Sequence, residues 1–115
     1  MAGKQKLAHF AEMKTFPNVF EPETEEIFRT DYHTKGNWSK KIFKNDNPII
    51  LELGCGKGEY SVGMARKFPD KNYIGCDIKG ARMWRGAKTS QDEGINNVAF
   101  FRTRIEFIEG GFAID

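Results

Sequence analysis

The sequence contains no apolar run near the ~20 residues that a membrane span requires, and its start, MAGKQKLAHF, lacks the apolar stretch of a secretory signal. Both absences predict a cytoplasmic protein with no membrane partner. Cysteine is scarce: Cys55 and Cys76 form no CxxC motif and have no ligand-like spacing to His9 or His33. We therefore expect reduced, partly buried thiols and no metal site. A net charge of +2 is too small to indicate nucleic-acid binding by itself.

Short apolar runs alternate with amphipathic segments from Pro48 onward, which is typical of βαβ units and a parallel sheet. Strands are expected at residues 48–53, 72–77 and 97–102, helices at 59–68 and 80–93, and a further helical start at 105–109. Gly94 is the expected stop of the second helix. The pattern predicts an α/β fold.

Residues 1–47 differ, because they mix aromatic and charged residues without a long period. We interpret them as an N-terminal arm, partly helical and partly irregular, that precedes a domain over 48–115. The acidic run 22–26 is a favourable start for a short helix. A second short helix is expected over 38–43, with Asn37 as its N-cap.

Three glycines, Gly54, Gly56 and Gly58, stand between the first expected strand and the first expected helix, and predict a tight turn. Such a turn occurs both at ligand sites and as plain structure. Two carboxylates make a site the better interpretation. Glu52 lies in an otherwise apolar strand, where burial without a partner would cost several kcal/mol, so a hydrogen-bonding or cationic group should face it. Asp77 ends the next strand, at the edge where open α/β sheets bind ligands, and can accept both hydroxyls of a ribose.

Two cofactor classes fit a glycine turn of this kind. Dinucleotide-binding domains use GxGxxG, whereas the spacing here is GxGxG, and their pyrophosphate gives no role to a carboxylate at Glu52. S-adenosylmethionine has an ammonium and a sulfonium, which acidic residues complement. The residues therefore favour a methyltransferase over an NAD-dependent oxidoreductase.

A closer resemblance rests on three segments: LELGCGKGEY (51–60), FPDKNYIGCDIKGARMW (68–84) and NNVAFFR (96–102). Together they resemble bacterial tRNA (guanine-N7-)-methyltransferases, and KLAHFAEMKTFPNVFEP (6–22) is similar to the N-terminal arm of one branch of that family. The resemblance implies a Rossmann-like class I methyltransferase sheet, S-adenosylmethionine as donor, and N7 of a guanine in the tRNA variable loop as acceptor. It also implies that Glu52 and Asp77 bind the cofactor.

The sequence departs from the family pattern at two places. Arg104 occupies the position of the acidic or amide residue that usually contacts the adenine end, and a guanidinium cannot accept hydrogen bonds. The Asp-Pro motif expected after a fourth strand is absent, so no catalytic residue is assigned. We interpret the chain as the N-terminal half of such an enzyme, cut after about three strands, with its first strand left as an exposed apolar edge. A truncated, non-catalytic fragment that binds cofactor or RNA is the alternative.

RNA contacts are a separate question. Lys4, Lys6 and Lys14 alternate with Phe10 and Phe16, and a second set has the same mixture: Lys35, Trp38, Lys40, Lys41 and Lys44. Such residues can bind phosphate and stack on bases, but solvated lysines beside aromatics packed on the core give the same pattern. The second helix has a basic face formed by Arg82, Arg85 and Lys88. This face too can be either an RNA contact or an ordinary solvated surface.

Overall fold

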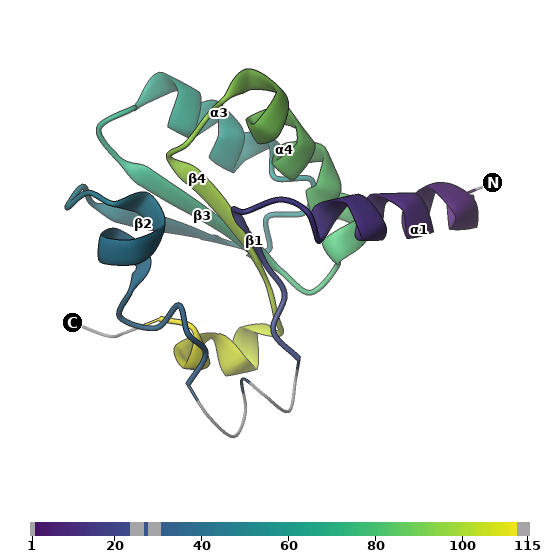
Figure 1. Ribbon diagram of the computed structural model, residues 1–115, viewed down its shortest axis with the longest axis horizontal. Coiled ribbons are helices and arrows are strands. Elements are labelled where there is room, and N and C mark those ends of the chain that lie inside the picture. The colour runs from purple at the N-terminus through teal and green to yellow at the C-terminus, as the bar shows by residue number, and fades with distance from the viewer. Residues whose placement is uncertain (1, 24–26, 28–30, 113–115) are drawn as a thin grey trace.

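The computed structural model describes residues 2–23, 27 and 31–112, without the side chains of residues 2–4 and 105. A parallel four-stranded sheet in the order β1-β4-β3-β2 forms its centre (Figure 1). The strands are β1 (Val19–Phe20), β2 (Ile49–Leu53), β3 (Asn72–Asp77) and β4 (Val98–Arg102). The helices are α1 (Ala2–Met13), η1 (Trp38–Phe43), α3 (Glu59–Lys67), α4 (Gly80–Glu93) and η2 (Ile105–Gly110). None of the helices in these described ranges is long and apolar enough to cross a membrane.

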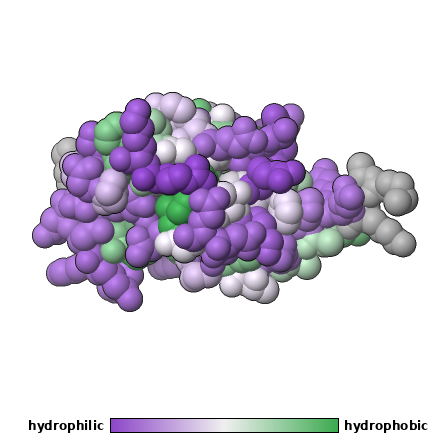
Figure 2. Space-filling model, turned by 90° about the horizontal axis from the view of Figure 1, so that it is seen from above, coloured by the Kyte–Doolittle hydropathy of each residue, from purple (hydrophilic) through white to green (hydrophobic). Residues whose placement is uncertain are grey.

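Both faces of the two central strands are buried, because successive side chains of a strand point to opposite faces. Tyr73 and Phe100 belong to the cluster under α3 and α4, whereas Ile74 and Phe101 belong to the cluster that includes Trp38 of η1. Helices therefore cover the sheet on both sides, as a parallel sheet requires. The outer surface of the α3 and α4 layer is predominantly hydrophilic (Figure 2).

The elements expected after Pro48 are confirmed, and with them the α/β class. β3 and α4 begin and end where the sequence predicts, and the segment from 105 forms a 3₁₀ helix. Gly94 adopts the left-handed conformation at φ +65°, and its N–H donates to the carbonyls of Ser90 and Gln91. This is the expected helix stop.

The arm contains more regular structure than the sequence indicates. α1 is a three-turn helix that projects past the N-terminal end of α4 (Figure 1). β1 adds a strand to the sheet by pairing with β4. The short helix expected at 38–43 is present as η1. Asn37 precedes it but makes no side-chain capping bond and donates instead to the carbonyls of His33 and Lys35. Most of the acidic run, 24–26, lies outside the described residues, and the domain division at 47/48 stays a prediction.

β2 is one edge of the sheet, and the exposed apolar edge expected there is present. Ile50, Leu51 and Leu53 are 38%, 39% and 52% exposed. At the opposite edge, β1 covers β4 with only two residues.

Candidate cofactor site

The loop from Gly54 to Gly58 joins β2 to α3 in the conformation that its glycines predict. Gly54, Gly56 and Gly58 have φ values of +75°, +56° and +76°, which side chains rarely tolerate. At Gly58 space is a second constraint, because a Cβ would lie 2.5 Å from Cε1 of the buried Phe100. Gly86 of α4 packs against the same loop, where a Cβ would meet the carbonyl oxygen of Lys57 at 2.8 Å.

Most backbone N–H groups of this loop bind the protein itself. Those of Gly54 and Cys55 donate to the Cys76 carbonyl at 2.7 and 2.9 Å, and that of Gly58 donates to the Cys55 carbonyl at 2.9 Å. The N–H of Gly56 donates to Oδ2 of Asp77 at 2.8 Å. A phosphate-binding loop needs such donors free for the ligand. This loop is therefore poorly suited to a pyrophosphate.

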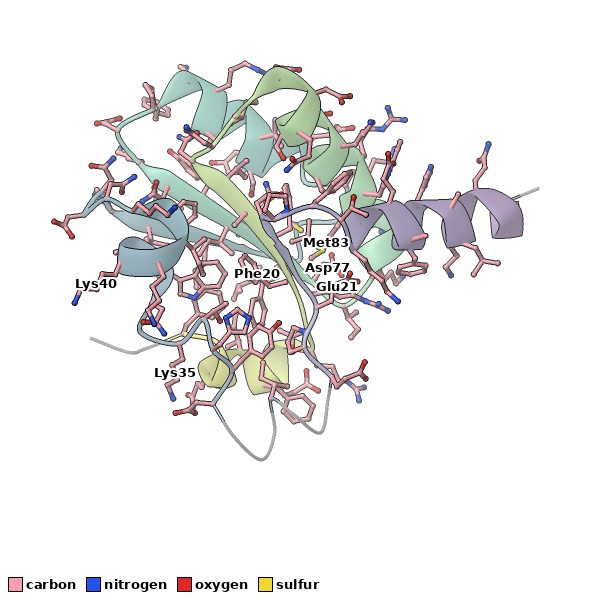
Figure 3. The ribbon with its side chains drawn as sticks, in the orientation of Figure 1. Phe20, Glu21, Lys35, Lys40, Asp77 and Met83 are labelled. Atoms are coloured by element: carbon pink, nitrogen blue, oxygen red, sulfur yellow. The ribbon has the colours of Figure 1, made fainter. Side chains whose placement is uncertain are left out.

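Asp77 lies at the carboxyl end of β3 and joins the glycine loop to the turn that precedes α4 (Figure 3). Its two oxygens accept the N–H groups of Gly56 and Lys79, the latter at 3.0 Å. Burial favours the neutral carboxyl, but the backbone hydrogen bonds and then the charge of Arg82 outweigh it and lower the pKa of Asp77 below its ordinary value. An ionised carboxylate has further lone pairs, so Asp77 can still accept hydrogen bonds from a ligand.

Glu52 has the hydrogen-bonding partner that its place in an apolar strand predicts. The hydroxyl of Ser61 in α3 donates to Oε1 of Glu52 at 2.6 Å, and the carboxylate is half-buried. Ser61 itself is buried. Nothing in the sequence indicates this pair beyond the need of Glu52 for a partner, because a serine within a helix is common.

A pocket of about 240 Å³ opens between the glycine loop and the ends of β3 and β4. It brings together three of the predicted site residues, Gly54, Asp77 and Arg104, and Glu106 also lines it. Glu52, Gly56 and Gly58 are not among its lining residues. Nε of Arg104 lies 3.7 Å from Oε2 of Glu106. Sequence reasoning placed Arg104 and missed Glu106, which supplies an acceptor two residues later in η2.

The two cysteines are free, as expected, and both are buried. Burial raises the pKa of the Cys76 thiol to about 12, and burial together with the nearby carboxylates of Asp77 and Glu52 raises the pKa of the Cys55 thiol still further. Both thiols are therefore protonated near neutral pH, which makes them weak nucleophiles.

Within the described residues, the Phe, Tyr and Trp side chains of the arm are buried or partly buried against the protein. Phe16 packs against the core cluster, Trp38 is 4% exposed, and Phe10 lies beneath the guanidinium of Arg102 at 4.9 Å. On α4, Lys88 pairs with Glu12 at 3.5 Å and with Asp92 at 3.3 Å. The Lys4 side chain lies outside the described residues. Base stacking on Trp38 is therefore excluded in this conformation, whereas Lys6, Arg82 and Arg85 remain exposed.

A parallel sheet with a glycine loop after its edge strand and a carboxylate after the next strand is a Rossmann-like cofactor-binding fold. The family model described as "Putative methyltransferase" matches residues 46–113. The chain belongs to this methyltransferase family, and the match includes the loop, Asp77 and the pocket.

Two relatives are similar over nearly the whole chain, and both are named tRNA (guanine-N(7)-)-methyltransferase. The protein of Christiangramia forsetii is 60% identical over 98% of this chain and 50% of its own length, and that of Bacteroides fragilis is 57% identical over 96% and 44%. The chain thus spans about half the length of these relatives. The solved structure of PKMT2 from Rickettsia typhi in complex with AdoHcy is 25% identical, with a TM-score of 0.47, over 76% of this chain and 17% of that one.

Proposed function

We propose that this chain forms the donor-binding part of an S-adenosylmethionine-dependent tRNA (guanine-N7-)-methyltransferase. The observation that carries the proposal is the glycine loop: most of its N–H groups donate to the protein itself, and the carboxylates of Glu52 and Asp77 lie beside it. Such a site suits a cationic ligand and repels a pyrophosphate. The names and high identity of the relatives support tRNA as the acceptor.

The residues present fit this donor. Asp77 has lone pairs left for the two ribose hydroxyls, and Glu106 offers an acceptor near the adenine end, where Arg104 has none. Glu52, held by Ser61, is the carboxylate available to the methionyl ammonium. The glycines let the backbone approach closely, and Gly86 lets α4 close behind the loop.

Binding and orientation are what these residues contribute to the reaction. S-adenosylmethionine supplies an electrophilic methyl group when bound. Guanine N7 has an in-plane lone pair and no proton to lose, so the transfer depends on proximity and alignment more than on a general base. Asp77 accepts hydrogen bonds from both the glycine loop and the turn before α4, and so holds these two segments together as one wall of the donor pocket. No described residue is assigned a catalytic role.

Calorimetry with S-adenosylhomocysteine tests the donor site. We expect Glu52→Gln to weaken binding about tenfold, because it removes a charge that complements the ammonium. Glu59→Gln is the matched control: Glu59 is exposed at the start of α3, and its loss should change affinity less than about twofold. NADH should not bind.

Absence of heat with S-adenosylhomocysteine, or an unchanged affinity in Glu52→Gln, would overturn the donor assignment. Methyl transfer is measured separately, by mass spectrometry of tRNA nucleosides after incubation with S-adenosylmethionine. Donor binding without 7-methylguanosine would identify the chain as a binding fragment rather than a complete enzyme.

A further inference from the structure

A groove of about 550 Å³ lies between α1 and the start of α4, next to the candidate cofactor pocket. Ile78 lines both hollows. Cations from three elements line the groove: Lys6 of α1, Lys79 and Arg82 at the start of α4, and Arg102 of β4. Among the described residues that line it, no Asp or Glu occurs. This concentration of positive charge contrasts with the nearly neutral chain.

Three of these cations, Lys6, Lys79 and Arg82, form no side-chain hydrogen bond or ion pair within the described part of the chain. The side chains of Lys6 and Lys79 are exposed. Arg102 is occupied, because its Nη1 lies 3.4 Å from Oε2 of Glu21 and its Nε donates to the Ile78 carbonyl. Arg82 lies over the glycine loop, 3.7 Å from the place of a Cβ on Gly56. Lys6, Lys79 and Arg82 are therefore available to a ligand, and because Arg82 also lies beside the candidate cofactor loop, Lys6 and Lys79 are the two that test the groove alone.

α1 is held against α4 by polar contacts that determine where Lys6 lies. Nε1 of Trp84 donates to Oε1 of Glu12 at 2.6 Å, and Nζ of Lys88 lies 3.5 Å from Oε2 of the same carboxylate. The ring of His9 stacks on Trp84 with centroids 3.6 Å apart and 4° between planes. Lys6 lies one turn before His9 on the same face of α1. The contacts of Glu12 and His9 thus place Lys6 at the groove.

We propose that this groove binds the phosphate backbone of the RNA substrate and guides it past the donor pocket. The proposal rests on the proposed function, because the shared wall at Ile78 gives the groove a role only if the acceptor is RNA. Unpaired lysines in a concave surface without carboxylates suit phosphates, which contribute affinity and register rather than base specificity.

The first experiment compares two double variants that remove the same charge from different places. Lys6→Gln with Lys79→Gln alters the groove, whereas Lys67→Gln with Lys71→Gln alters two lysines that lie over the ring of Phe68, next to the start of β3 and at the other end of that strand from Asp77. Affinity for tRNA is measured by fluorescence anisotropy over a range of salt. We expect the groove variant to bind about tenfold more weakly, with its salt slope reduced by about 0.7 per lost phosphate contact, and the control to change less than about twofold. Equal losses in both variants, or no loss in either, would overturn the proposal.

A second variant separates geometry from bulk charge. Glu12→Ala raises the net charge by one and frees α1 from Trp84. Unspecific attraction predicts tighter tRNA binding, whereas a built groove predicts binding about fivefold weaker, because Lys6 is no longer held. Glu93→Ala is the matched control: it makes the same charge change at the exposed pair with Arg66 and should not weaken binding. Retained or tighter binding by Glu12→Ala contradicts the proposal.

Titrating S-adenosylhomocysteine into the unaltered chain keeps the two proposals separate. A chain that binds S-adenosylhomocysteine but not tRNA overturns the groove and leaves the donor site standing. A chain that binds tRNA through the groove lysines without S-adenosylhomocysteine supports the groove and overturns the donor site. If the groove variant loses affinity for phosphatidylserine vesicles but keeps its affinity for tRNA, the surface recognises lipid and the RNA proposal fails.

Discussion

Asp77 has two roles, a ligand contact and a structural link, and the sequence predicts only the first. Its position after β3 predicts a ligand contact, and its hydrogen bonds to Gly56 and Lys79 also join the glycine loop to the start of α4. The same carboxylate thus shapes the pocket and faces it. Removing its charge should therefore affect stability as well as binding.

We expect Asp77→Asn to lower the free energy of unfolding by about 1–3 kcal/mol at neutral pH, because an amide NH₂ would face a backbone donor. The folded pKa of Asp77 lies below its ordinary value of 3.8, so its contribution is present above that value and is lost as the pH falls through the lower folded pKa. The gap between wild type and Asp77→Asn should close below about pH 4. Urea unfolding at a series of pH values measures this.

Asp92→Asn is the control for this experiment. Asp92 is exposed and pairs with Lys88 on the surface of α4, so its replacement should cost less than about 0.5 kcal/mol. A gap for Asp77→Asn that persists unchanged into acid would show that its carboxylate is not the ionised acceptor of these bonds.

The helices and strands after Pro48 could be predicted because a helix buried on one face has an apolar period in its sequence, and a strand buried on both faces is a short continuous apolar run. β3 and α4 have buried residues at strand and helix spacing, and their bounds follow. α1 could not be found this way, since of its described residues only the last, Met13, is fully buried in the core, whereas Glu12 and His9, which contact α4, are polar and Leu7 is 72% exposed. β1 has only two residues, too few for any period.

The candidate site likewise contains residues that could be predicted from the sequence and residues that could not. Glycines and Asp77 could be predicted because left-handed turns and strand ends restrict residue type. The partner of Glu52 could be expected only as a chemical class, and Ser61 became identifiable only from the structure, in which α3 packs on the sheet and its Ser61 hydroxyl reaches Glu52. Glu106 depends on the path of η2, which the sequence does not determine locally.

The start of α3 offers a test of how the loop is constrained. Gly58→Ala combines a left-handed φ of +76° with a Cβ 2.5 Å from Phe100, whereas Gly94→Ala has φ +65° and nothing within 4 Å. We expect Gly94→Ala to cost about 1–2 kcal/mol from backbone strain alone, and Gly58→Ala about 1–3 kcal/mol more. Denaturant unfolding of both variants gives the comparison. Equal costs would mean that Phe100 moves aside without penalty.

The two edges of the sheet differ in how they are protected. β1, which belongs to the N-terminal arm, covers one edge, and the apolar strand β2 forms the other edge, where no described residue pairs with its outer side. A flat, apolar edge strand is a template for pairing with another chain unless charges interrupt it. In β2 the single charge is Glu52, which Ser61 holds. β2 therefore has no free charged side chain that would prevent another chain from pairing with this edge.

We expect the chain to associate with itself as its concentration rises from micromolar to millimolar, through β2. Leu51→Lys places a charge in the middle of the edge and should raise the concentration at which association begins about tenfold. Leu7→Lys makes the same change on the exposed surface of α1 and should leave association unaltered. Light scattering measures the mass, and urea unfolding checks that each variant is folded. Equal suppression by both substitutions would assign the association to general apolar exposure rather than to the β2 edge.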